Sequence, residues 1–165
     1  IGSFQRDTEG HDLNSPKLSK GPDRFIKIIK DLNKKNLNLE VLLTGKRRNY
    51  IIHELEREQI NYKYFEMSSF NELNELYNIL NLYIVSSRYE GGPASIMECA
   101  ITKTPIISTD VGIASEILSQ ESIFNMENFL YAKPNIEIAY KNVEKYKIPN
   151  GFEKYNQLLQ DIYES

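Results

Sequence analysis

The stretch from Leu82 to Glu98, LYIVSSRYEGGPASIME, decides the fold. Its first five residues form an apolar run typical of a strand that is covered on both faces. Two glycines followed by Pro93 then indicate a tight turn into a helix, with the proline at the first helical position. A strand that runs through a glycine turn into a helix is the repeating unit of parallel α/β sheets.

The same alternation extends over the rest of the chain. Apolar residues recur at helical spacing within 25–32 and 73–80, which predicts two amphipathic helices. Short apolar runs typical of buried strands are LEVLLT (39–44), YKYF (62–65) and PIIS (105–108). Two further helices are expected over 136–146 and 151–163, the second with an apolar stripe of Phe152, Tyr155, Leu159 and Ile162. We therefore predict a single doubly wound, Rossmann-like α/β domain with a mainly parallel sheet over residues 1–165.

One long stretch, Asp7 to Ser19, is polar and rich in turn-forming residues. A loop of this length is longer than usual, and such loops are often functional or mobile. We predict that this irregular insertion is mobile in the empty protein.

Ligands of doubly wound sheets bind beyond the carboxyl ends of the strands, which directs attention to the turn after Ser86. The first N–H groups of the following helix, those of Ala94, Ser95 and Ile96, have no partner one turn earlier and can bind an anion. Gly91 and Gly92 would let a phosphate approach the backbone closely. Plain turn formation remains the alternative interpretation of this Gly-Gly-Pro.

Two glutamates bracket this helix start. Glu98 stands among apolar neighbours, where a carboxylate is costly unless it is paired or hydrogen-bonded. It either lies on a hydrated stripe of the helix or accepts hydrogen bonds from hydroxyl groups of a ligand. Glu90 by itself would be an ordinary solvated loop carboxylate.

Composition excludes several other classes of protein. A net charge of −3 argues against a nucleic-acid-binding domain, which usually has a basic excess. The single cysteine, Cys99, excludes an internal disulfide and suits a reducing compartment. The apolar runs are all shorter than the roughly 18 residues that a membrane span needs. The two histidines, His11 and His53, are not grouped with acidic residues at metal-ligand spacing, so no metal site is predicted.

Taken together, these residues resemble glycosyltransferase family 4, the large retaining group with the two-domain GT-B fold. Glu90 and Glu98 match its E-x7-E motif, and the segment 103–112, KTPIISTDVG, is similar to the family's G-x-PVVATDVGG. The strand end VLLTG (41–45) is similar to the family's strand before the nucleotide. The opening IGSFQR, followed after the insertion by Lys20-Gly21, is similar to the family's VGRL…KG.

The resemblance implies a role for each matching residue. Arg6 and Lys20 would hold the donor diphosphate and stabilise the leaving group. Because the insertion from Asp7 to Ser19 separates these two residues, we expect it to become ordered when a diphosphate binds, so protease cutting within it should slow when UDP or GDP is added. Glu98 would accept the ribose hydroxyls, and Glu90 would contact the donor sugar and act in catalysis. The other implied donor-binding residues are Gly91, Gly92, Pro93, Ala94, Ser95, Ile96 and Met67.

Some implied contacts stay open at this stage. The base would lie near Phe65, Glu66 and Met67, with Met67 or Leu73 either against its face or packed in the core. The basic run Lys46-Arg47-Arg48 either faces the phosphates or is a solvated helix start.

The reaction implied is transfer of a sugar from a UDP- or GDP-sugar, with retention, in glycan or polysaccharide biosynthesis. Neither a cofactor nor a metal is expected, because cationic side chains replace the metal. The acceptor, a glycan or a lipid-linked molecule, would bind an N-terminal domain that lies outside this chain, so the chain alone is expected to be inactive. The expected location is the cytoplasm, with association of the whole enzyme with the inner face of the membrane left open.

The alternatives are a sugar-nucleotide epimerase, a sugar phosphorylase and a non-catalytic nucleotide-binding module of the same fold.

Overall fold

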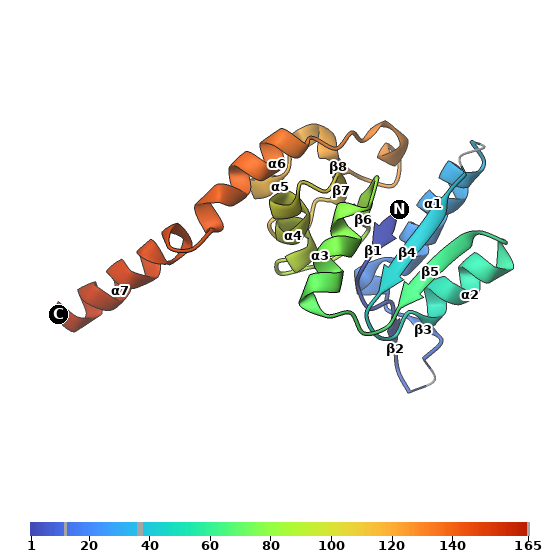
Figure 1. Cartoon of the computed structure of the whole chain (residues 1–165), viewed down its shortest axis with the longest axis horizontal. Coiled ribbons are helices and arrows are strands. Elements are labelled where there is room, and N and C mark those ends of the chain that lie inside the picture. The colour runs from blue at the N-terminus through green and yellow to red at the C-terminus, as the bar shows by residue number, and fades with distance from the viewer. Residues whose placement is uncertain (12, 36–37, 165) are drawn as a thin grey trace.

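The structure, a computed structural model, describes residues 1–11, 13–35 and 38–164. In these residues a six-stranded parallel sheet is covered by helices on both faces (Figure 1). The strands are β1 (Gly2–Ser3), β4 (Glu40–Thr44), β5 (Asn61–Phe65), β6 (Tyr83–Val85), β7 (Ile106–Thr109) and β8 (Ile123–Phe124). Their spatial order is β5-β4-β1-β6-β7-β8, the order of a Rossmann-like fold. The predicted fold class is confirmed.

Helices follow the strands in the alternation that the sequence predicts. The α-helices are α1 (Pro22–Asn33), α2 (Asn49–Arg57), α3 (Phe70–Asn78), α4 (Ala94–Thr102), α5 (Ala114–Ile117), α6 (Ile136–Val143) and α7 (Glu153–Glu164). The short 3-10 helices are η1 (Leu18–Lys20), η2 (Gln120–Ser122), η3 (Phe129–Tyr131), η4 (Glu144–Tyr146) and η5 (Asn150–Phe152). The predicted helix over 136–146 is therefore an α-helix that ends in a 3-10 turn.

Successive strand residues face the two sides of the sheet and join two separate cores. Val41 and Leu43 pack with α1 and α2, whereas Leu42 between them packs with α3 and α4. Ile84 and Val85 divide in the same way. Because both faces are buried there, β4, β6 and β7 are almost continuously apolar in sequence. The prediction that YKYF forms a buried strand is wrong in its burial, because β5 lies at the edge of the sheet and its residues are exposed or half-buried.

The sheet reverses its direction of winding between β1 and β6. From β1 the chain continues to β4 and β5 on one side of the sheet, and then returns to β6 on the other side. The loops after these strands separate at this point and leave a crevice, which is the usual binding site of such sheets. The residues after β1, β4 and β6 therefore meet there.

The insertion is not irregular, which corrects the prediction. Its residues Thr8–Glu9 (β2) and Ser15–Pro16 (β3) pair as an antiparallel hairpin, and it ends in η1. Asp7 and Thr8 are buried, so the insertion is anchored where it begins. Asp12 lies outside the described residues. The prediction that a ligand orders the insertion can therefore concern only the exposed residues that follow Asp7 and Thr8, and it stays a prediction.

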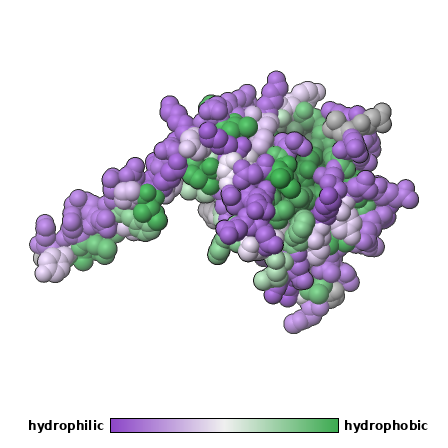
Figure 2. All heavy atoms as spheres, in the orientation of Figure 1, coloured by the Kyte–Doolittle hydropathy of each residue, from purple (hydrophilic) through white to green (hydrophobic). Residues whose placement is uncertain are grey.

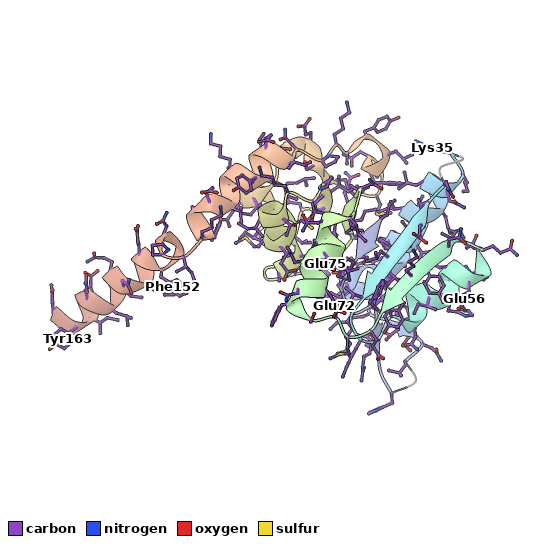
Figure 3. All side chains as sticks on the ribbon, in the orientation of Figure 1. Lys35, Glu56, Glu72, Glu75, Phe152 and Tyr163 are labelled. Carbon is purple, nitrogen blue, oxygen red and sulfur yellow. The ribbon has the colours of Figure 1, made fainter. Side chains whose placement is uncertain are left out.

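The last helix departs from the rest of the fold. Its apolar stripe does not pack into the core: Phe152, Tyr155, Leu159 and Ile162 are between 52% and 64% exposed. The helix projects from the α/β body, with Phe152 near its base and Tyr163 near its tip (Figure 3). Apolar residues gather along one side of this projection (Figure 2).

Candidate functional site

A cleft of about 540 Å³ lies beyond the carboxyl ends of β1, β4 and β5, against the start of α4. Its lining includes residues from each of the segments that follow these strands. They are Phe4, Gln5, Arg6, Lys17, Lys20, Thr44, Gly45, Lys46, Glu66, Met67, Ser68, Leu73, Tyr77, Glu90, Pro93, Ala94, Ser95 and Glu98. Most of the residues that the sequence singled out therefore come together in one place, although they are distant along the chain.

Three of the expected residues lie elsewhere. Ile96 is fully buried in the core, and its N–H donates to the Pro93 carbonyl at 3.1 Å, so it does not face the cleft. Gly91 and Gly92 are exposed and are not part of the lining. The helix also begins one residue later than expected. Pro93 is extended and caps the helix, and Ala94 is the first helical residue.

Gly91 belongs to a neighbouring hollow of about 450 Å³, where Asp110 and Gly112 also lie. Gly112 has φ +53°, and a side chain there would come within 2.9 Å of the Gly91 carbonyl oxygen. The glycine in the TDVG segment is thus explained by backbone packing against the glycine turn. Glu90 lines both spaces, so the glutamate stands between the cleft and this hollow.

Lys20 is placed by a close backbone contact with the end of β6. The next residue, Gly21, has φ +63°, and a Cβ atom there would lie 1.9 Å from the Ser86 carbonyl oxygen. The Ser86 hydroxyl donates to the Gly21 carbonyl at 2.8 Å, and the Gln5 amide donates to the Lys20 carbonyl at 2.9 Å. Only glycine allows this approach, which fixes the lysine backbone at the edge of the cleft.

The Lys20 ammonium group contacts Glu90. Its Nζ atom lies 2.5 Å from both carboxylate oxygens, and the Ser87 hydroxyl donates to Oε1 at 2.9 Å. The Glu90 side chain is 9% exposed and that of Lys20 is 28% exposed. Glu90 is therefore a largely buried carboxylate with a cation and a hydroxyl group as partners, and not the solvated loop residue that its position alone indicates.

Glu98 has a different partner, which sequence reasoning missed. The Tyr77 hydroxyl donates to Glu98 Oε2 at 2.6 Å. Tyr77 is buried and packs against Phe4, with ring centroids 4.9 Å apart. Burial raises the pKa of Tyr77 well above its usual range, so the phenol keeps its proton and acts as the donor. The helical spacing of Tyr77 indicated a core residue, but its hydroxyl group also reaches the cleft.

The basic run after β4 divides between the cleft and the core. Lys46 lines the cleft, whereas Arg48 is 1% exposed and donates to Asp7 Oδ2 at 2.8 Å. Its guanidinium group also donates to the carbonyl oxygens of Ser3 and Thr44. Arg48 is buried and does not line the cleft, so it fits neither the interpretation of a solvated helix start nor that of a residue facing the phosphates.

Four cationic side chains line the cleft: Arg6, Lys17, Lys20 and Lys46. Three carboxylates accompany them: Glu66, Glu90 and Glu98. Of the seven, Lys17 was not predicted, because it lies within the insertion. Such a lining, next to the free N–H groups of α4, is suited to an anion that also carries hydroxyl groups. The described residues hold no group of three or more His, Cys, Asp or Glu placed to bind a metal.

A model of the family described as glycosyl transferases group 1 matches residues 15–160. The chain belongs to this family. No curated protein sequence matches the chain significantly. Within the described residues, no helix of this group 1 glycosyltransferase domain has both the length and the apolar composition needed to cross a bilayer.

Solved structures share the fold of this domain. A glycosyltransferase from Rickettsia africae ESF-5 superimposes with a TM-score of 0.74 at 18% identity, over 98% of this chain and 47% of its own. The pneumococcal O-GlcNAc transferase GtfA, solved in complex with UDP and GlcNAc, gives 0.64 at 17% identity, over 99% of this chain and 36% of its own.

The C-terminal domain of the group 1 protein LpcC from Francisella tularensis gives 0.57 at 20% identity, over 90% of this chain and 84% of that domain. The chain thus spans about a third to a half of the longer glycosyltransferases that it matches.

Proposed function

We propose that this domain binds the nucleotide-sugar donor of a retaining glycosyltransferase, with a UDP- or GDP-sugar as the ligand. One observation carries the proposal: both glutamates of the E-x7-E motif and the two cations of the opening segment line a single cleft. The complex of GtfA with UDP and GlcNAc, a protein of the same fold, supports this choice of ligand.

In this proposal the diphosphate lies against the start of α4, where Ala94 and Ser95 offer the N–H groups of the first helical turn. Arg6 and Lys20 add compensating positive charge, as do Lys17 and Lys46 beside them. A leaving diphosphate gains negative charge as the sugar departs, and preorganised cations stabilise that charge. The side chains present can fill the role of a metal, so we propose that UDP binds equally well in EDTA and in magnesium.

Glu98 is the residue proposed to hold the ribose. Tyr77 donates to its Oε2 atom, which fixes the carboxylate group and leaves Oε1 for a ligand hydroxyl group. Met67 is 73% exposed at the rim and Leu73 lines the wall, and we propose that the base packs against them. Glu90 would contact the sugar that is transferred.

The acceptor is proposed to bind outside this chain, because the chain spans only about a third to a half of the longer glycosyltransferases that it matches. Sugar transfer by the 165-residue chain alone would contradict that part of the proposal. We also propose that the acceptor is a glycan or a lipid-linked molecule, and that the protein is cytoplasmic.

Calorimetry with UDP and GDP tests the function. Glu98→Ala is expected to weaken binding of UDP and of the UDP-sugar alike. Losing a hydrogen bond to a charged group costs about 1.5–3 kcal/mol, which is roughly 10- to 150-fold in affinity. Glu75, an exposed glutamate of α3, supplies the matched control Glu75→Ala (Figure 3). If neither nucleotide binds the intact protein, or if Glu98→Ala binds as the wild type does, the proposed function is wrong.

A further inference from the structure

The cleft contains one cation that is already neutralised. Of the four that line it in the described part of the chain, Lys20 alone forms an ion pair with a carboxylate, that of Glu90. The contact is bidentate, at 2.5 Å to each oxygen, and the Ser87 hydroxyl group supports the same carboxylate. An incoming diphosphate therefore competes with Glu90 for Lys20.

The outcome of this competition depends on which hydrogen-bond donors the ligand offers to Glu90 in place of Lys20. A bare nucleoside diphosphate that takes Lys20 leaves a carboxylate of 9% exposure without its cation, which is unfavourable because little water can reach it. If Lys20 stays with Glu90, the phosphates gain less positive charge and lie beside a negative one. A sugar-bearing donor brings hydroxyl groups that can donate to Glu90 in place of the Lys20 ammonium group.

We infer that Glu90 is a specificity-determining residue that weakens binding of the bare nucleoside diphosphate relative to the sugar-bearing donor. It does so by keeping the Lys20 ammonium group in an ion pair, away from the phosphates. This inference rests on the proposed function, since it assumes a nucleotide sugar in the cleft. Its consequence is directional: the product of transfer, which no longer carries the sugar, binds less tightly than the substrate. The Lys20–Glu90 pair re-forms as the product leaves.

The test is calorimetry on the 165-residue chain with UDP, UDP-N-acetylglucosamine and inorganic pyrophosphate. Glu90→Gln keeps the shape of the side chain but removes the charge that holds Lys20. We expect this variant to bind UDP and pyrophosphate about tenfold more tightly, a change typical of one charge-assisted contact. Affinity for UDP-N-acetylglucosamine should fall, because the sugar loses a charged acceptor. The preference for donor over product then decreases by at least the same factor.

Two controls separate the ion pair from a general effect of charge. Asp110→Asn removes a carboxylate from the hollow on the other side of Glu90, outside the cleft, while Lys20 stays paired with Glu90, so it should change UDP affinity far less. In a Lys20→Met background, Glu90→Gln should no longer tighten UDP binding, because no cation is left to release.

The outcomes distinguish this inference from the proposed function. If wild type binds UDP and Glu90→Gln binds it no more tightly, the inference is wrong and the proposed function stands. An equal gain from Asp110→Asn, or a gain that persists without Lys20, overturns it in the same way. If neither nucleotide nor pyrophosphate binds any of these proteins, the proposed function fails and the inference fails with it.

Discussion

Two ion pairs stand at the two ends of the insertion, and they differ in burial. The side chains of Asp7 and Arg48, at its beginning, are 1% and 0% exposed, whereas those of Lys20 and Glu90, just beyond its end, are 28% and 9% exposed. The Arg48 guanidinium group also donates to two backbone carbonyls, and Asp7 accepts the N–H of Tyr50 at 3.2 Å. The inner pair is enclosed by the fold, while the outer pair lies in the wall of the cleft.

This difference in burial separates a pair that is enclosed by the fold from one that a ligand in the cleft could reach. The inner pair joins the ends of β1 and β4 to the insertion, so it shapes the cleft without facing it. Taking one partner away leaves the other charge buried, and the whole cost falls on folding. In our inference the outer pair exchanges partners with a ligand, so a change there is expected to appear in binding.

Breaking the inner pair should have the largest effect. Arg48→Met leaves Asp7 buried and unpaired, which is expected to lower the free energy of unfolding by about 3–5 kcal/mol. Urea unfolding measures the loss. Arg47→Met is the matched control, because Arg47 is less buried and its guanidinium group donates to the exposed Gly10 carbonyl instead of a buried carboxylate. An Asp7→Leu/Arg48→Met double variant should recover part of the stability. Equal losses from Arg47→Met and Arg48→Met would contradict a special role for the buried pair.

Removing the hydrogen-bond partner of Glu98 should have a smaller effect, on the binding of UDP. Tyr77→Phe removes only the hydroxyl group that donates to Glu98, so UDP should bind more weakly by about 0.5–1.5 kcal/mol, or roughly 2- to 10-fold. Tyr62→Phe is the control, because the Tyr62 hydroxyl also donates to a glutamate, Glu56, on the surface. Calorimetry compares the two. If both variants bind UDP as the wild type does, Tyr77 does not position Glu98 for the ligand.

A third pair, Asp23 with Arg88, is more exposed and should show the smallest effect. The bidentate hydrogen bonds from Arg88, at 2.7 and 2.8 Å, lower the pKa of Asp23. A lowered pKa stabilises the fold above the unfolded value of about 3.9, and this stability is lost as pH falls through the folded value. Asp23→Asn should therefore be slightly less stable than wild type at pH 7, and the difference should shrink below about pH 4. Urea unfolding at several pH values checks this, and a constant difference would be contrary to it.

Much of the fold follows from local patterns. The runs of β4, β5, β6 and β7 lie within one residue of their predicted bounds. For β4, β6 and β7 the reason is that strands buried on both faces need continuous apolar sequence, whereas β5 is an edge strand whose residues are exposed or half-buried. The Gly-Gly-Pro turn and the spacing of Glu90 and Glu98 located the cleft, since both glutamates line it. The helix start was misplaced by one residue, because Pro93 suits both the first helical position and the residue before it.

Other features depend on contacts between distant segments. Nothing in the run Lys46-Arg47-Arg48 distinguishes the lysine that lines the cleft from the arginine that enters the core. Arg48 is buried because Asp7, 41 residues away, lies beside it in the folded chain. Likewise the hairpin within the insertion forms where its first residues are held by that pair. The polar sequence of the insertion therefore predicts neither the buried pair nor the hairpin.

The sequence by itself therefore determined the kind of fold, the edge of the sheet where the cleft lies and the charged residues available there. Periodicity and turn residues act over a few positions, so they can be read along the chain. Only the tertiary structure decided which charges are already paired. Lys20 and Glu90 are 70 residues apart and Tyr77 and Glu98 are 21 apart, and whether such groups meet depends on how the strands and helices pack in three dimensions.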